Sequence, residues 1–194
     1  MNAAAFIDRD GVVNELVPDP GSQLPESPLD PAQVVLMPGV AGALRRLRAA
    51  GYLLVGVSNQ PAAAKGKVAF ATLEAVQARV LDLLRAEGIE PDGFKLCFHH
   101  PGGTVPELAR SCDCRKPAPG MLLEAARDLG LDLGSSWMIG DTDDDVAAGA
   151  AAGCRTVLVE NPSSAHKRRG AAQPDVCAPD LGAAAERLLV FEAR

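Results

Sequence analysis

The stretch AAAFIDRDGVVN, residues 3–14, begins with an apolar run that ends in two aspartates. Only Arg9 separates Asp8 from Asp10, and Gly11 follows at once. Short apolar runs bounded by turn-forming residues are typical of buried strands, and a glycine lets the chain turn sharply. The stretch therefore predicts a buried strand that carries two carboxylates to its end, with Asp10 past the strand in the following loop.

Further apolar runs alternate with amphipathic helical patterns along the chain. Strands are expected at 3–7, 52–57, 93–98, 136–139 and 155–159, and helices at 40–50, 68–87, 119–129, 143–152 and 181–190. Buried strands alternating with helices are typical of a parallel sheet covered on both faces. The pattern predicts an α/β fold with a three-layer, doubly wound parallel sheet in a single domain, residues 1–194. Five prolines predict a loop over residues 15–33.

The composition excludes several classes of protein. A formal net charge of −6 argues against a nucleic-acid partner, and the basic run HKRRG (166–170) is interpreted as a solvated loop. No apolar run approaches the ~20 residues that a bilayer requires, and no signal peptide is recognised, so we expect a cytoplasmic protein without a membrane partner. Nothing in the sequence indicates a subunit interface, and a monomer is expected.

Polar residues gather at the predicted carboxyl ends of separate strands. Asp8 and Asp10 follow the first strand, Ser58 the second and Asp141 the fourth, while Lys116 precedes a helix. Ligands of such sheets bind at this edge. Carboxylates suit Mg²⁺, and a hydroxyl and a lysine suit phosphoryl oxygens. The set predicts phosphoryl chemistry in which one aspartate forms an aspartyl-phosphate and the other serves as general acid and base.

A cluster of cysteines and histidines predicts a structural zinc site. The candidate ligands form two close pairs, and fourteen residues (98–111) separate the first cysteine of one pair from the first cysteine of the other. The four ligands are Cys97, His99, Cys112 and Cys114. His100 is an alternative to His99 as the fourth ligand. Cys154 and Cys177 lie in apolar surroundings and are expected to be small buried residues.

Four motifs together resemble those of the haloacid dehalogenase superfamily of phosphatases, over residues 4 to about 160. They are FIDRDGVVN, VGVSNQ, CRKPAPGM and MIGDTDDDVAAG. The resemblance implies that Asp8 is the nucleophile and Asp10 the acid/base, while Ser58 and Lys116 hold the phosphoryl group. It also implies a Mg²⁺ site formed by the Asp8 carboxylate, the Asp10 carbonyl and Asp141, with Asp145 behind these ligands.

A zinc loop at 97–114 that runs into CRKPAPGM resembles one group in the superfamily, the D-glycero-D-manno-heptose 1,7-bisphosphate phosphatases. The histidinol-phosphate phosphatases are a looser match. The resemblance implies a capless, haloacid dehalogenase-like fold in which this loop shapes the substrate pocket. It also implies that Arg115, Asn59, Gln60 and Lys65 bind substrate.

The stretch SNQPAAAKG departs from the usual pattern of that group, Thr-Asn-Gln followed by Ser-Gly-Ile-Ala-Arg-Gly. Lys65 replaces the expected arginine, and Thr142 stands where a lysine is common. These changes lie around the pocket and leave the catalytic acids in place. The expected activity is Mg²⁺-dependent hydrolysis of a small sugar phosphate, and the favoured substrate group is the 7-phosphate of heptose bisphosphate. Another small phosphomonoester such as histidinol phosphate is an alternative substrate. A zinc-stabilised binding module is the non-enzyme alternative.

Overall fold

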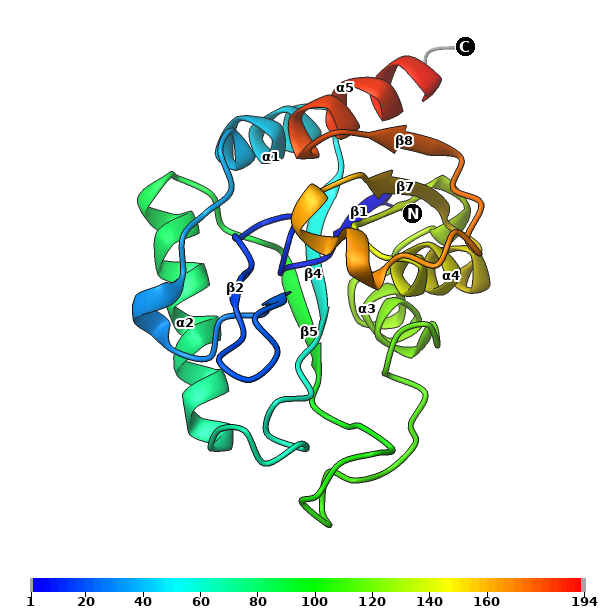
Figure 1. Ribbon diagram of the computed structural model, residues 1–194. Helices are drawn as coiled ribbons and strands as arrows, with labels where there is room; N and C mark the ends of the chain where they lie inside the picture. Colours follow the sequence, from blue (N-terminus) through cyan, green and yellow to red (C-terminus); the bar gives the residue numbers. More distant parts are fainter. Residues whose placement is uncertain (1, 193–194) are drawn as a thin grey trace.

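The computed structural model describes residues 2–192 and contains a six-stranded parallel sheet between two layers of helices (Figure 1). The strand order is β5-β4-β1-β6-β7-β8, and the strands are β1 (Ala4–Ile7), β4 (Leu53–Asn59), β5 (Gly93–Cys97), β6 (Trp137–Gly140), β7 (Arg155–Val159) and β8 (Val176–Ala178). The chain steps outward from β1 through β4 and β5, then returns to β6 on the other side of β1. This confirms the predicted doubly wound sheet, and its strand order reverses beside β1.

The helices cover both faces of the sheet. On one face lie α1 (Val40–Ala49), α2 (Phe70–Ala86) and α5 (Leu181–Glu192), and on the other lie α3 (Gly120–Leu129) and α4 (Asp143–Ala152) (Figure 1). Alternate side chains of β1 enter the two cores, with Ile7 in the first and Phe6 in the second. Because β1 is buried on both faces, its sequence is a continuous apolar run without alternation.

The proline-rich segment after β1 forms short irregular elements. A two-residue antiparallel ribbon pairs β2 (Val17–Pro18) with β3 (Pro25–Glu26), and the 3₁₀ turn η1 (Pro31–Gln33) follows. Two more such turns are η2 (Leu133–Ser135) and η3 (Pro162–Lys167). Ten residues, 60–69, connect β4 to α2 and leave no room there for a large cap. No helix among residues 2–192 is both long and apolar enough to cross a bilayer.

The two cysteines outside the cluster differ in environment. Cys154 is buried, as expected from its apolar surroundings. The prediction for Cys177 is wrong, because this residue is exposed. Cys177 lies in β8, the last strand of the sheet, which the sequence pattern did not identify. Successive side chains of a strand point to opposite faces, and here Ala178 is buried while Cys177 faces solvent.

Candidate active site and metal cluster

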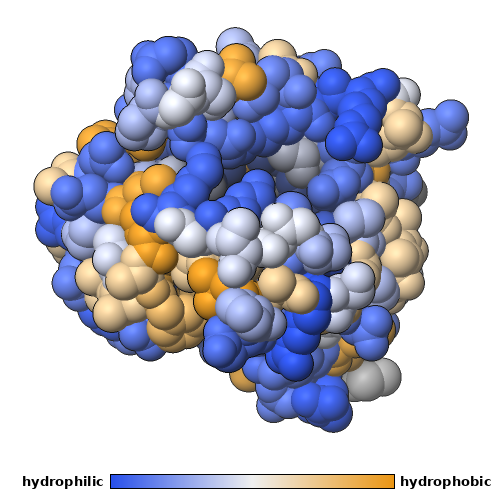
Figure 2. Space-filling view, turned by 60° about the horizontal axis from the view of Figure 1, so that its bottom comes forward, coloured by the Kyte–Doolittle hydropathy of each residue, from blue (hydrophilic) through white to orange (hydrophobic). Residues whose placement is uncertain are grey.

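A cavity of about 630 Å³ lies at the carboxyl ends of the central strands. Figure 2 looks onto this side of the molecule and shows a hollow surrounded mainly by hydrophilic residues. The five residues that the sequence predicted to converge all line the cavity, namely Asp8, Asp10, Ser58, Lys116 and Asp141. They come from segments up to 133 residues apart, and the parallel sheet brings them to one edge.

Lys116 is the buried cation of this site. Its Nζ lies 2.9 Å from Oδ1 of Asp8 and 2.6 Å from Oδ1 of Asp145, and it donates a hydrogen bond to the carbonyl of Val57 at 2.8 Å. Burial alone would lower the pKa of Lys116, but the charges of Asp145 and Asp8 outweigh it and raise the pKa. Lys116 is therefore charged, with its ammonium group fixed beside the predicted nucleophile.

Asp8 and Asp141 are buried carboxyls that face each other across the cavity floor. Burial raises the pKa of Asp8 to about 6, although Lys116 opposes this shift. Burial and the charges of Asp8 and Asp145 raise the pKa of Asp141 to about 8. Both carboxylate oxygens of Asp141 are buried without a hydrogen-bond partner among the described residues. Oxygens of Asp8, Asp141 and Asp145 lie within 4.8 Å of one another, a donor set that suits a hard divalent cation.

Asp145 belongs to this acidic group, but protein donors already engage its carboxylate. Lys116 pairs with Oδ1, while the backbone N–H and the hydroxyl of Thr142 donate to Oδ2 at 3.0 and 2.6 Å. Thr142 is the N-cap residue of α4, so the start of this helix holds Asp145 in place. These contacts favour Asp145 as the residue that orients Lys116, and they leave Asp8 and Asp141 to face a cation.

The carboxylate of Asp10 is held away from Asp141 by a buried network that the sequence did not reveal. Arg9 donates to both oxygens of Asp10, at 3.1 and 2.9 Å, and Asn14 and Gln60 add hydrogen bonds of 2.9 and 2.5 Å. Burial alone would raise the pKa of Asp10, but the charge of Arg9 and the hydrogen bonds from these donors outweigh it and lower the pKa. The resting Asp10 is therefore an ionised carboxylate.

Arg9 is fully buried, which is rare for an arginine. Besides Asp10, its guanidinium contacts the side-chain oxygen of Gln77 in α2 at 3.1 Å. The sequence analysis gave Arg9 no role beyond separating the two aspartates. The available signal was an arginine placed between two aspartates at the end of an apolar run, since a buried guanidinium requires an acidic partner.

Ser58 and Asn59, which end β4, and Gln60, which follows the strand, have different surroundings. Ser58 lines the cavity and accepts a hydrogen bond from Gln60 at 3.0 Å, so its hydroxyl can donate a hydrogen bond to a ligand. Asn59 also lines the cavity, where its side chain exchanges two 3.0 Å hydrogen bonds with the backbone of Lys116. Gln60 is buried outside the cavity lining and contacts Asp10 instead. Gln60 therefore contacts a predicted catalytic acid, and its contact with substrate stays a prediction.

The remaining predicted substrate-binding residues, Lys65 and Arg115, lie in the cavity wall. Burial and the nearby charge of Arg115 lower the pKa of Lys65. One guanidinium nitrogen of Arg115, Nη1, is buried without a hydrogen-bond partner among the described residues. Two cations this close favour a ligand of opposite charge.

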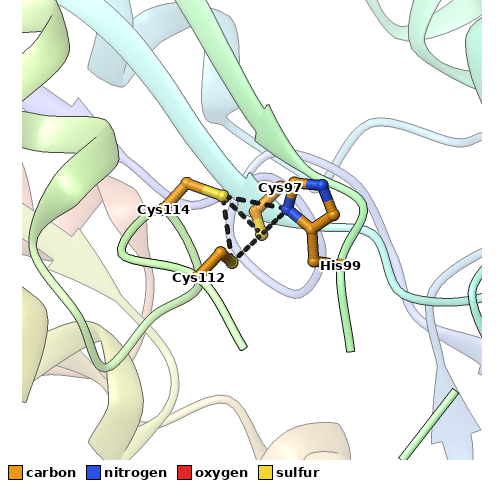
Figure 3. Close-up of side chains that lie close together, drawn as sticks. All are labelled: Cys97, His99, Cys112 and Cys114. Carbon is orange, nitrogen blue, oxygen red and sulfur yellow. Dashed lines mark hydrogen bonds between the residues drawn. The ribbon is translucent and has the colours of Figure 1, made fainter. Parts of the chain in front are cut away.

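The predicted cysteine–histidine cluster is assembled at the end of β5. Figure 3 shows its four side chains turned toward one another. The sulfurs of Cys114, Cys97 and Cys112 lie 3.0–3.5 Å apart, and Nδ1 of His99 lies 3.4 Å from Cys114 and 3.9 Å from Cys97. His100 is outside the cluster, because its Nδ1 accepts the backbone N–H of Gly102.

The four candidate ligand atoms lie within 4.8 Å of one another, close enough to hold one metal ion. Zinc–sulfur bonds of ~2.3 Å place sulfurs about 3.8 Å apart at the corners of a tetrahedron, near the observed separations. Burial raises the pKa of the Cys97 and Cys114 thiols, which a bound cation would offset. Arg110 donates to Nε2 of His99 at 2.8 Å. A metal on Nδ1 would leave the proton on Nε2, so Arg110 would have to turn away.

The chain is similar to known phosphatases. A family model described as HAD-hydrolase-like matches residues 113–184. A D-glycero-beta-D-manno-heptose-1,7-bisphosphate 7-phosphatase of Salmonella typhi is 39% identical over 80% of this chain and 79% of its own length, and one of Yersinia pestis is 36% identical over 89% and 87%. The crystal structure of a D,D-heptose 1,7-bisphosphate phosphatase from B. bronchiseptica, complexed with magnesium and phosphate, superposes with a TM-score of 0.79 at 31% identity, over 97% of this chain and 99% of the other.

Proposed function

Because the chain belongs to the D-glycero-beta-D-manno-heptose-1,7-bisphosphate 7-phosphatase family of the haloacid dehalogenase-like hydrolases, we propose that it removes the 7-phosphate of that bisphosphate. The chain is a phosphoric monoester hydrolase, and its ligand is a small phosphorylated sugar. The observation that carries the proposal is the buried group of Asp8, Lys116 and Asp141 at the cavity floor, where a nucleophile, a cation and a free carboxylate meet.

In the first step, a carboxylate oxygen of Asp8 attacks the phosphorus and the bond from phosphorus to the sugar oxygen breaks. Lys116 and the Ser58 hydroxyl lie where they can donate to the phosphoryl oxygens as charge builds up on them. The departing sugar oxygen takes a proton from Asp10. Asp10 is ionised at rest. The negative charges of an arriving phosphate raise its pKa, so Asp10 takes up a proton from solvent as substrate binds and then donates that proton.

In the second step, Asp10 accepts a proton from water, whose oxygen attacks the phosphorus of the aspartyl-phosphate. The bond between Asp8 and phosphorus breaks, which releases inorganic phosphate and restores the Asp8 carboxylate. Asp10 thus acts first as acid and then as base, while the network of Arg9, Asn14 and Gln60 keeps its carboxylate in one place.

Mg²⁺ is the proposed cofactor of the cavity floor, held by Asp8, Asp141 and the backbone carbonyl of Asp10. When bound, it neutralises charge on the transferring phosphoryl group and on the carboxylates. The unpartnered oxygens of Asp141 and its raised pKa support this assignment. Zinc is the proposed structural ion of Cys97, His99, Cys112 and Cys114, and such a four-ligand site leaves no open position for chemistry. The protein is proposed to act as a cytoplasmic monomer.

Phosphate release from a panel of esters tests the proposed function. The panel contains D-glycero-β-D-manno-heptose 1,7-bisphosphate, histidinol phosphate, other sugar phosphates and p-nitrophenyl phosphate. We expect the heptose bisphosphate to have the highest kcat/KM, and equal values across the panel would contradict this substrate. Asp8→Asn should abolish turnover because an amide is a poor nucleophile. Unchanged activity in that variant would remove Asp8 from the mechanism and favour a binding module.

A further inference from the structure

Arg9 is a fully buried residue that joins the predicted acid/base to a helix outside the cavity. Its Nε and Nη2 donate to the two carboxylate oxygens of Asp10, at 3.1 and 2.9 Å. Its Nη1 donates to the side-chain oxygen of Gln77 in α2 at 3.1 Å. Because the guanidinium is planar and each of its nitrogens has an acceptor, these hydrogen bonds fix its orientation. Arg9 is not among the residues that line the cavity, so it acts on a ligand only through Asp10.

The Asp10 carboxylate depends on Arg9 more than on any other donor. In the described part of the chain it accepts four hydrogen bonds from side chains, of which two come from Arg9 and one each from Asn14 and Gln60. Asn14 and Gln60 belong to the loops that follow β1 and β4, at the edge of the sheet. Arg9 also bonds to Gln77, so it connects the carboxylate to α2, a helix packed on the face of the sheet.

A purely structural ion pair is the simpler account of Arg9 and Asp10, and two arguments favour more than that. A buried ion pair adds little to stability, because the desolvation of its charges offsets their attraction, and apolar residues of similar volume often replace it without loss. Asp10 is also not enclosed in the core, because it lines the cavity where a ligand can reach it. Arg9 therefore holds a carboxylate that faces the space where proton transfer is proposed.

We propose that Arg9 is the positioning residue of the proton-transfer steps and that Gln77 anchors it from α2. Together they keep the Asp10 carboxylate in the place and plane from which it reaches the departing sugar oxygen and later the attacking water. This inference rests on the proposed function, since it takes Asp10 as the acid/base. A displaced Asp10 slows every step that moves a proton through it. Transfer of the phosphoryl group to Asp8 keeps its rate when the leaving group needs no proton.

Arg9→Lys tests the positioning while it keeps the charge. A lysine places one ammonium beside Asp10, but it cannot hold both carboxylate oxygens and Gln77 in one plane. We expect kcat for D-glycero-β-D-manno-heptose 1,7-bisphosphate to fall by about tenfold, which is part of the 10²–10⁴-fold that general acid–base catalysis contributes. KM should stay within about twofold of wild type, because Arg9 contacts no ligand.

p-Nitrophenyl phosphate separates the proton-transfer steps from a general disturbance of the site. p-Nitrophenol is far more acidic than a sugar hydroxyl, so it departs without a proton from Asp10. With protein in excess over ester, Arg9→Lys should release p-nitrophenol at the wild-type rate. The later release of inorganic phosphate needs Asp10 as base and should slow by about tenfold. Acid-quenched samples of the variant should therefore contain more covalently bound phosphate than wild type.

Gln77→Leu is the milder variant, because it keeps the pair of Arg9 and Asp10 and removes only the anchor. It should lower kcat for the bisphosphate by about threefold and have no further effect in the Arg9→Lys background, since residues that act through one contact are not additive.

Val80→Ala is the matched control, because Val80 is buried in α2 one turn after Gln77 and its side chain makes no hydrogen bond. It should destabilise the fold in urea yet keep wild-type kcat.

Wild-type kcat in either Arg9→Lys or Gln77→Leu would overturn the inference and leave the proposed function standing. A release of p-nitrophenol that slows as much as the release of phosphate would overturn it too, because Arg9 would then act on Asp8 or on the fold as a whole. If Arg9→Lys does not fold, the same two assays on Gln77→Leu decide. A wild-type protein that releases no phosphate from the bisphosphate would contradict the proposed function itself, before any variant is compared.

Discussion

Nζ of Lys116 lies 2.9 Å from Oδ1 of Asp8, and both side chains are buried. Lys116→Met removes the cation that pairs with Asp8 and that donates to the incoming phosphoryl group. Loss of one such preorganised donor should lower kcat by about 10²–10³-fold. Because Asp8 and Asp145 would then be buried without a cation, the free energy of unfolding should also fall, by about 3 kcal/mol. Steady-state kinetics and urea unfolding measure the two effects.

Lys95→Met is the control for this loss of charge. Lys95 pairs with Glu124 and Asp128 at 2.9 and 2.7 Å, but all three side chains are partly exposed. Its removal should change the free energy of unfolding by less than about 1 kcal/mol and leave kcat unaltered. If Lys116→Met kept wild-type kcat, Lys116 could not be a phosphoryl donor.

The turn after Asp10 has no room for a side chain. A Cβ at Gly11 would lie 2.1 Å from Oδ2 of Asp141, and Gly11 has a φ of +90°. Gly51 has nearly the same φ, +93°, but nothing lies within 4 Å of its Cβ position. Gly51→Ala should therefore cost only the backbone strain, about 1–2 kcal/mol. Gly11→Ala should cost about 1–3 kcal/mol more and also reduce activity, because Asp141 must move.

Chemical denaturation of both alanine variants, with phosphatase assays, measures this difference. Equal destabilisation by the two substitutions would mean that the Gly11 turn shifts easily and that Asp141 is less constrained than its contacts indicate.

The sheet and the acids at its edge could be predicted because local sequence determines them. The run Ala4–Ile7 is apolar throughout since both of its faces are buried, and that property is visible without a structure. Once parallel strands are recognised, their carboxyl ends must share one edge, so Asp8 and Asp141 were expected on the same side of the sheet. They lie close together because β1 and β6 are neighbouring strands. The cysteine cluster was equally accessible, because ligand type and spacing define it.

The residues that were missed depend on contacts between distant segments. Arg9 is buried because Gln77 in α2, 68 residues away, meets its guanidinium. Lys167 reaches the cavity because Asn161 and Arg168 bond to the loops after β1 and β6. No local pattern encodes such contacts, and a basic run in a polar segment has the same composition as a solvated loop. The three-residue strand β8 is too short for a periodic signal.

The pH dependence of magnesium stabilisation follows from the raised pKa values of Asp8 and Asp141, about 6 and about 8. A carboxyl whose folded pKa exceeds its unfolded value stabilises the fold most when protonated, below about pH 4. That contribution is lost as pH rises through 6 and then 8. Mg²⁺ binds the ionised carboxylates, so the increase in Tm that it causes should be larger near about pH 8.5 than near about pH 5.5.

Thermal unfolding with and without added Mg²⁺ at the two pH values measures this effect. In Asp141→Asn the carboxylate is absent, so the pH dependence of the Mg²⁺ effect should be much smaller. A Mg²⁺ effect that is the same at both pH values in wild type would show that Asp8 and Asp141 do not release protons on binding.

Zinc content provides the last prediction. Protein purified without exposure to a chelator should contain about one zinc per chain, because four candidate ligands lie close together. Cys112→Ser replaces a thiolate by a hydroxyl and should lose the zinc. It should also lower Tm, since an ion held by the cluster would tie residues 97–99 at the end of β5 to the segment that leads into α3.

Cys154→Ser is the matched control, because Cys154 is also a free thiol but lies outside the cluster. It should retain the zinc even though it loses some stability from burying a hydroxyl. Elemental analysis of the three proteins separates the two kinds of cysteine. Wild-type protein without zinc, or Cys112→Ser with a full complement, would contradict the assignment. Loss of zinc in Cys112→Ser with loss of turnover would further show that the loop ordered by the ion positions Arg115 and Lys116, which directly follow Cys114.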